Sequence, residues 1–300
     1  MAAHWVRRRT PGCARASFFG GSSDATVTNE TSIEAASPMK SIRHALGVLM
    51  LFSDVNRPLS VTEVARALKL HKSSASRILL TLLDARFVER HRESGKYSLG
   101  LGILSLSGSV LARYQLPSTS RRDLEDLAEQ VQETVTVSGW NGCEAVNLDQ
   151  IFGGGSVVNM SPPGRTNPAH CTATGKVFMA YLDRGMQDEL LAQALQRFTA
   201  KTITNPMKLR AELQRVRTHG YALNEQEFDV DVDSIAAPVF NSTGAISYVI
   251  AVTLPHFRYD AATRGRLAEA ITATAKSLSA RLGYVRPVRS ELLPEAPLAG

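Results

Sequence analysis

The sequence has no long hydrophobic run and few cysteines. No apolar stretch approaches the ~20 residues that a membrane-spanning helix needs, so we expect a soluble protein. The three cysteines, Cys13, Cys143 and Cys171, are far apart and form no C-x-x-C pair. This spacing argues against a disulfide framework and against a cysteine-based metal site, and it fits a reducing cytoplasm.

The sequence also lacks a visible catalytic constellation. Gly175-Lys176 is similar to the end of a phosphate-binding loop, but His170 stands where that loop needs glycine, and Val177 where it needs Ser or Thr. The run at 153–156, GGGS, does not have the G-x-S-x-G spacing of a nucleophile elbow. We therefore predict that the protein is not an enzyme and that it uses no cofactor.

Three aspartates alternate at strand spacing, at Asp229, Asp231 and Asp233. This spacing would place all three carboxylates on one face of a strand. No histidine or glycine-bent loop accompanies them in the sequence, so we expect a solvated acidic edge rather than a metal site.

Positive charge is concentrated in one part of the chain. Residues 40–115 hold 12 Lys and Arg against 5 Asp and Glu, a net charge of +7. Residues 116–300 hold 18 against 20, a net charge of −2. Such localisation is what binding to nucleic-acid phosphates requires.

Residues 60–84, within this basic segment, are typical of two helices joined by a tight turn. Ser60 and Glu63 form an S-x-x-E capping box at the first helix start. Apolar residues recur at helical spacing in two stripes, Val61, Val64, Ala65 and Leu68, then Ala75, Ile78, Leu79 and Leu82. The other face of the second helix holds Lys72, Ser73, Ser74, Ser76 and Arg77. Short hydroxyls allow close approach to a DNA major groove and cations reach phosphates or guanine edges, so we predict that this face binds DNA.

A glycine-tipped hairpin is predicted next, with strands at 87–90 and 96–99 around Ser94-Gly95. Its cations, Arg90, Arg92 and Lys96, would lie against the phosphate backbone as a wing. A preceding helix would complete the small core with one face formed by Ile42, Ala45, Leu46, Leu49 and Phe52. Together these elements predict a winged helix-turn-helix. The alternative is an ordinary amphipathic helix pair with a solvated charged face.

We expect five segments along the chain: a disordered tail at 1–38, the winged helix at 39–100, a linker helix within 101–117, a second domain at 118–284 and a flexible tail at 285–300. The tail at 1–38 is rich in Ser, Thr, Ala and Gly and shows no sustained periodicity. The linker helix has an apolar face, formed by Ile103, Leu106, Val110 and Tyr114. This face would pack against the same helix of a second subunit or against its own domain.

The second domain shows a mixed α and β pattern. Helices are predicted at 121–131, 174–182, 206–217 and 261–282, and strands at 134–140, 144–150, 156–160, 221–224, 234–240 and 245–254. Turn signals at Asn141-Gly142 and at 241–244 join neighbouring strands, and Asn205-Pro206 caps a helix. Strands in the middle with helices outside predict an antiparallel-rich sheet covered by helices.

With these elements in order, the chain resembles the IclR family of transcriptional regulators over residues 41–284. Four stretches carry the resemblance: YSLG at 97–100, NPAHCTATGKVFMA at 167–180, VRTHGYALNEQE at 216–227 and IAAPVFNSTG at 235–244. The resemblance implies an α+β chain with an N-terminal winged helix-turn-helix, a linker helix and a C-terminal GAF/PAS-like α/β effector-binding domain. It also implies operator DNA as a partner and homodimers that often pair into homotetramers.

The resemblance further implies where an effector binds. Contacts in similar proteins fall at the positions matching Ala173, Thr174, Asn224, Val232, Ser234, Ala251 and Thr253. Asn224 stands where an acidic residue occurs in the family, Ser234 where cysteine is frequent, and Ala251 where a hydroxyl residue occurs. The ligand class that the family implies is a carboxylated metabolite, such as an aromatic or short organic acid.

The start of the predicted helix near Thr174 is a separate reason to expect an anion. A helix start presents unpaired backbone N–H groups and a favourable dipole. Thr172 and Thr174 add hydroxyl donors there. The alternative is that these threonines only cap the helix.

These observations predict a cytoplasmic, ligand-responsive regulator that binds operator DNA as a homodimer or homotetramer. A ligand near Thr174 and Ser234 would change the spacing between the winged helices of the two subunits. It can do so only if it binds one conformational state of the protein more tightly than the other. One rival is a small-molecule-binding enzyme with an accessory DNA domain, which needs catalytic residues. Another is a non-specific DNA-binding protein, which predicts steep salt dependence without sequence discrimination.

Overall fold

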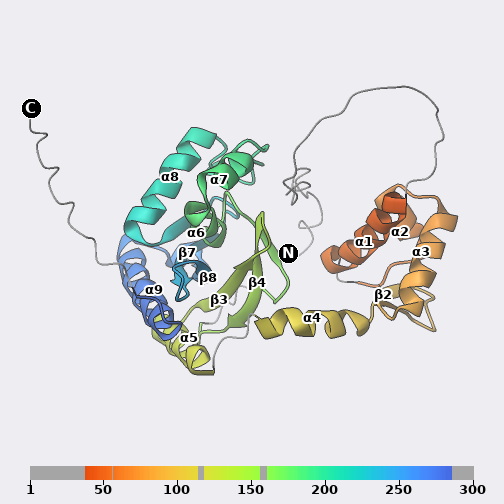
Figure 1. Cartoon of the computed structure of the whole chain (residues 1–300), viewed down its shortest axis with the longest axis horizontal. Coiled ribbons are helices and arrows are strands. Elements are labelled where there is room, and N and C mark those ends of the chain that lie inside the picture. The colour runs from red at the N-terminus through yellow and green to blue at the C-terminus, as the bar shows by residue number, and fades with distance from the viewer. Residues whose placement is uncertain (1–37, 56, 114–117, 156–160, 286–300) are drawn as a thin grey trace, which may run out of the picture. The chain divides into compact units, whose positions relative to one another are not determined.

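The computed structural model describes residues 38–55, 57–113, 118–155 and 161–285. These residues form two compact units, one ending at Arg113 and the other beginning at Ser118 (Figure 1). Nearly all of the two predicted tails, and the strand predicted at 156–160, lie outside the described residues. Within the described residues, no helix is both long enough and apolar enough to cross a membrane.

The first unit is a winged helix followed by a further helix, and its elements are α1 (Pro38–Val55), α2 (Val61–Leu68), α3 (Lys72–Asp84), β1 (Val88–Arg90), β2 (Tyr97–Leu99) and α4 (Gly102–Arg113). The capping box is confirmed, because Ser60 Oγ accepts from Glu63 N at 3.3 Å and Glu63 Oε2 accepts from Ser60 N at 2.8 Å. Lys69 ends α2 in the left-handed region, with φ of 54°. The strands β1 and β2 pair antiparallel, as the hairpin prediction requires.

The core of the first unit corrects the face predicted for α1. Val48 and Phe52 of α1 are buried together with the apolar stripes of α2 and α3. Ile42 and Leu46, which were expected in this core, are 61% and 57% exposed. In helical geometry Val48 and Phe52 share one face, whereas Ile42 and Leu46 lie on the neighbouring face, which the three-helix core does not cover.

The second unit is a six-stranded antiparallel sheet with helices on both faces (Figure 1). Its elements are α5 (Ser118–Val131), β3 (Thr134–Trp140), β4 (Glu144–Ile151), β5 (Thr166–Pro168), α6 (Ala173–Tyr181), α7 (Arg184–Leu191), α8 (Pro206–His219), β6 (Ala222–Glu225), β7 (Val232–Phe240), β8 (Ile246–Pro255), the 3-10 turn η1 (His256–Arg258) and α9 (Ala261–Arg281). The strand order is β5-β4-β3-β8-β7-β6. The predicted antiparallel sheet covered by helices is confirmed.

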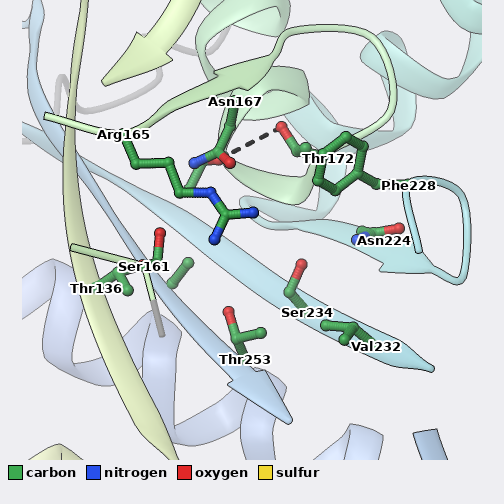
Figure 2. A pocket seen from close by; sticks show the side chains of 12 residues that line it. Thr136, Ser161, Arg165, Asn167, Thr172, Asn224, Phe228, Val232, Ser234 and Thr253 are labelled. Carbon is green, nitrogen blue, oxygen red and sulfur yellow. Dashed lines mark hydrogen bonds between the residues drawn. The ribbon is translucent and has the colours of Figure 1, made fainter. Parts of the chain in front are cut away.

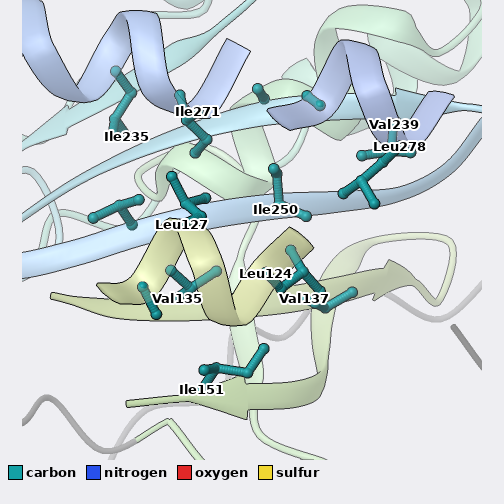
Figure 3. Close-up of a cluster of buried hydrophobic side chains, with 14 of the residues drawn as sticks. Leu124, Leu127, Val135, Val137, Ile151, Ile235, Val239, Ile250, Ile271 and Leu278 are labelled. Atoms are coloured by element: carbon teal, nitrogen blue, oxygen red, sulfur yellow. The ribbon is translucent and has the colours of Figure 1, made fainter. Parts of the chain in front are cut away.

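One face of this sheet packs against α5 and α9 through branched aliphatic side chains (Figure 3). Val135 and Val137 of β3, Ile250 of β8 and Ile271 of α9 are all at most 1% exposed there. Because side chains alternate along a strand, the residues between them face the other way, toward α6 and α8. The second face carries smaller side chains, among them Ala236 of β7.

Most predicted elements of the second unit agree with the structure to within a few residues, and three short ones, the turn η1 among them, were missed. Asn205 caps α8 by accepting from Lys208 N at 3.0 Å, with Pro206 at the first helical position, as predicted. The helix α7 and the three-residue strand β5 were not predicted. Asp183 is the cap of α7, accepting from Met186 N at 2.9 Å, and this residue was the available signal.

Candidate functional site

The helix α3 exposes the polar face that the sequence assigns to DNA. Lys72, Ser73, Ser74 and Arg77 are exposed and Ser76 is half-buried. Ala75, Leu79 and Leu82 on the opposite face are buried in the core of the first unit. The packing of that apolar face fixes the orientation of α3, so its cations and hydroxyls face outward as one surface, the geometry in which a helix enters a major groove.

The hairpin adds three cations that differ in exposure and in their contacts. Arg90 and Arg92 are exposed and Lys96 is half-buried. The Arg90 guanidinium lies over the Tyr97 ring, 5.8 Å from its centroid, and its Nε donates to Gly95 O at 3.4 Å. Arg90 therefore also helps to hold the hairpin together.

The second unit contains a cavity at one end of the sheet face that packs on α6 (Figure 2). The empty space between its lining residues, counted together with the adjoining open solvent, is about 580 Å³. The twelve lining residues come from β3, β5, β6, β7, β8, the start of α6 and two connecting segments, and they are Thr136, Ser161, Arg165, Asn167, Thr172, Thr174, Asn224, Phe228, Val232, Ser234, Ala251 and Thr253.

The structure brings most of the predicted effector residues to this cavity. Six of the seven line it: Thr174, Asn224, Val232, Ser234, Ala251 and Thr253. Ala173 does not line it, because its side chain is fully buried in the core between α6 and the sheet. Of the remaining lining residues, sequence reasoning singled out only Thr172, and it missed Thr136, Ser161, Arg165, Asn167 and Phe228.

The floor of the cavity is set by strand register. Asn224 of β6 pairs with Ser234 of β7, which in turn pairs with Thr253 of β8. These three residues therefore form a polar row across neighbouring strands. Thr136 of β3 pairs with Ala251 in the next row. The signal for Thr136 was present in the alternation of Thr134, Thr136 and Ser138 along β3, but only the fold shows that it reaches this cavity.

The start of α6 closes one side of the cavity, and Thr172, which lines the cavity, also caps this helix. Its hydroxyl donates to Pro168 O at 2.7 Å and accepts from Gly175 N at 3.1 Å. The Thr174 hydroxyl in turn donates to Thr172 Oγ1 at 3.5 Å. Gly175 is required because a Cβ there would lie 2.4 Å from the Ala169 Cα atom. Hydroxyls that cap the helix are largely engaged within the protein.

Arg165 supplies the positive charge of the cavity. It follows a Pro163-Gly164 turn in which Arg165 N donates to Pro162 O at 3.1 Å and Gly164 has φ of +86°. Proline followed by a left-handed glycine is the pattern of a type II turn. Arg165 O accepts from Asn147 N at 2.8 Å, which ties the turn to β4. Burial lowers the pKa of the guanidinium and the charge of Asp229 opposes that shift.

A buried ion pair lies behind the cavity wall. Lys176 of α6 is 1% exposed; its Nζ donates to Glu227 Oε1 and lies 3.7 Å from Glu212 Oε1. Burial raises the pKa of Glu227, and Lys176 opposes that shift. Asn224, which lines the cavity, accepts from Glu227 N at 2.9 Å. The ion pair therefore supports the loop that carries part of the cavity wall.

Asp233, beside Ser234 on β7, corrects the expectation of a solvated acidic edge for one of the three aspartates; Asp231 is exposed and Asp229 half-buried, and both precede β7. Its side chain is fully buried, and its Oδ2 lies 2.6 Å from His256 Nδ1. Burial raises the pKa of Asp233, and the His256 contact opposes that shift. His256 was not predicted as a partner because β8 separates it from Asp233 along the chain, although antiparallel pairing places both residues at one strand end. Among the described residues, no group of three His, Cys, Asp or Glu is placed to hold a metal ion.

Comparison with known proteins agrees with this arrangement. A model of the IclR helix-turn-helix domain matches residues 41–92, and a model of the bacterial transcriptional regulator IclR C-terminal domain matches residues 108–280. The chain is 28% identical over 247 residues to the HTH-type transcriptional regulator XynR of Escherichia coli, covering 82% of this chain and 98% of that one.

Solved structures show the same fold. A putative IclR transcriptional regulator from a Silicibacter species superposes with a TM-score of 0.70 at 28% identity, covering 82% of this chain and 98% of that one. An IclR homologue from Microbacterium hydrocarbonoxydans, solved in complex with 4-hydroxybenzoate, has a TM-score of 0.68 at 21% identity, with coverage of 81% and 98%. With both of its units matched in order, the chain belongs to the IclR family of bacterial transcriptional regulators.

Proposed function

We propose that this protein is a cytoplasmic regulator that binds operator DNA through its winged helix and releases or tightens that binding when a small organic acid enters the cavity of the second unit. The observation that carries the proposal is the pairing, in one chain, of an exposed basic helix face with a polar cavity that contains an arginine. A homologue's complex with 4-hydroxybenzoate supports a carboxylate as the ligand.

On the DNA side, the proposal assigns base and phosphate contacts to Lys72, Ser73, Ser74, Ser76 and Arg77 of α3, and phosphate contacts to Arg90, Arg92 and Lys96 of the hairpin. Winged-helix proteins of this kind read two half-sites, so the proposal includes a homodimer or a homotetramer. The half-exposed apolar side chains of α4, among them Leu106 and Val110 at 58% and 41% exposure, support a further packing partner for this helix.

The experiment that tests the proposal is selection of bound sites from a random duplex library at ~0.15 M salt, where non-specific binding is weak. We expect an enriched inverted repeat, and we expect candidate organic acids to change the affinity for that repeat. Binding without enrichment would support a non-specific DNA-binding protein instead. An enriched site whose affinity no acid changes would contradict the effector half of the proposal.

A further inference from the structure

The cavity differs from an ordinary small-molecule site in the chemistry of its lining. Typical ligand pockets are lined mainly by apolar side chains with a few polar groups. Here six of the twelve lining residues carry hydroxyls, two are asparagines and one is arginine, and only Phe228, Val232 and Ala251 are apolar. No Asp or Glu is among the twelve. A ligand that matches this lining is polar over most of its surface and is not a cation.

The floor hydroxyls lack partners of their own. Thr136 and Ser234 are 6% and 7% exposed, and no hydrogen bond within the described part of the chain involves their hydroxyls or that of Thr253. This contrasts with Thr172, whose hydroxyl is engaged in capping α6. Thr253 is half-buried, and none of the three hydroxyl oxygens is a buried atom without a partner, so these hydroxyls face the cavity and can bond water or a ligand there.

Strand register gives these groups a regular spacing. Asn224, Ser234 and Thr253 lie side by side on three neighbouring strands, and neighbouring strands are about 4.8 Å apart. A carbon chain laid across the strands can present hydroxyls to successive members of this row. A flat aromatic ring, by contrast, offers the row no donors or acceptors on its faces.

Arg165 points into the cavity from the opposite wall. Figure 2 shows its guanidinium extending into the space between Ser161, Ser234 and Phe228. A guanidinium binds a carboxylate through two parallel hydrogen bonds. Arg165 is the one cation among the twelve lining residues, so it is the group of the lining that would bind a carboxylate, although the charge of Asp229, outside the lining, also acts on it.

We propose that the effector is a short polyhydroxylated monocarboxylate, with its carboxylate on Arg165 and its hydroxyls on the row formed by Asn224, Ser234 and Thr253. This inference rests on the proposed function of the cavity as the effector site, and it specifies the ligand that the site selects. Phe228 and Val232 would contact the carbon chain of the ligand.

The test is calorimetric titration of the full chain, without DNA, using sets of ligands matched in length. One set is gluconate, hexanoate and sorbitol, and a shorter set is glycerate, propionate and glycerol; benzoate serves as the aromatic acid. We expect the hydroxy acid of at least one set to bind roughly tenfold or more tightly than its alkanoate, its polyol and benzoate. The alkanoate and benzoate lack the hydroxyls, and the polyol lacks the carboxylate.

Variants test which residues bind the carboxylate and which bind the hydroxyls. Arg165→Met should weaken hydroxy-acid binding roughly tenfold or more. Arg165→Lys should weaken it less, since lysine keeps the positive charge but cannot form the two parallel hydrogen bonds of a guanidinium. Ser234→Ala should weaken the hydroxy acid by roughly 2- to 10-fold without changing alkanoate binding. Arg122→Met, on the exposed side of α5, is the matched control and should change neither. Thermal unfolding without ligand checks that each variant is folded.

The outcomes separate this inference from the proposed function. Alkanoate or benzoate binding as tightly as the hydroxy acid would overturn the role of the hydroxyl row and leave an acid effector in place. Polyol binding as tightly, or unchanged binding in folded Arg165→Met, would overturn the role of Arg165. Binding of no compound, with an operator still enriched from the random library, would overturn the ligand class alone. Failure of both experiments would overturn the proposed function.

Discussion

Each unit contains a pair of charged side chains, and the two pairs lie in opposite environments. In the first unit, Lys72 and Arg77 of α3 lie exposed on a face that packs against nothing within the unit. In the second unit, Lys176 and Asp233 are buried and each contacts an oppositely charged or titratable partner. An exposed charge costs little to keep and is available to an external partner, whereas a buried charge must be matched within the protein. The same residue types are therefore available to an external partner in one unit and are matched within the protein in the other.

The largest effect should follow from removing the buried cation of the second unit. Lys176→Met leaves the Glu227 carboxylate buried without its cation, and one oxygen of that carboxylate, Oε2, already has no hydrogen-bond partner among the described residues. We expect the free energy of unfolding to fall by about 3–5 kcal/mol, measured by urea denaturation. The double variant Lys176→Met, Glu227→Gln should lose less than the sum of the two single variants. A loss below that of the exposed control Arg122→Met would contradict the assignment of this pair to stability.

The exposed cation of α3 should behave in the opposite manner. Arg77→Ala should weaken binding to the selected operator by ~1–3 kcal/mol where the contact is to a base edge. Its free energy of unfolding should change by no more than about 0.5 kcal/mol, because the side chain is exposed. Fluorescence anisotropy with a labelled operator measures the first quantity and urea denaturation the second. Unchanged operator affinity would remove Arg77 from the reading surface.

The sequence predicts those features that depend on residues close together along the chain, and it fails for those that depend on distant residues. The capping box of Ser60 and Glu63 and the cap at Asn205 are local, so residues a few positions apart were enough to predict them. The prediction for Ile42 failed because amphipathic spacing shows a face without showing which neighbour covers it. Alternation along a strand likewise placed Asp233 on a face, and only the pairing of β7 with β8 shows that the face is buried against His256.

The candidate cavity was predictable only in part, for the same reason. Ser234 was predicted from resemblance to a family, and Thr174 from that resemblance and from the helix start; both line the cavity. Arg165 was missed although Pro163-Gly164 is a local turn signal. A turn predicts that the next side chain projects from the chain, but it does not predict which site that side chain enters. Its position depends on the bond between Arg165 O and Asn147 N, which joins the turn to a strand 18 residues earlier. Ligand chemistry therefore depends on the long-range part of the fold.

The smallest effect expected is a pH response of opposite sign in the two units. Hydrogen bonds from Ser60 N and from Arg57 lower the pKa of Glu63 to about 2, whereas burial raises the pKa of Asp233. Unfolded Glu and Asp titrate near pH 4.3 and 3.9. Glu63 therefore stabilises the first unit above about pH 4.3, and this contribution is lost as the pH falls toward 2. The buried Asp233 carboxylate opposes folding at neutral pH, and this penalty disappears as the pH falls through its raised pKa.

Amide hydrogen exchange, read separately for α2 and β7, distinguishes the two contributions. Relative to the parent chain at each pH, Glu63→Gln should reduce protection of α2 at neutral pH and converge with it in acid. Asp233→Asn should raise the protection of β7 above that of the parent most strongly at neutral pH, where the parent carries a buried charge. This difference in protection should disappear in acid. Solvent screens Glu63, so its change should be the smaller of the two. If both variants shift protection in the same direction with pH, the contrast between exposed and buried charge does not extend to these carboxylates.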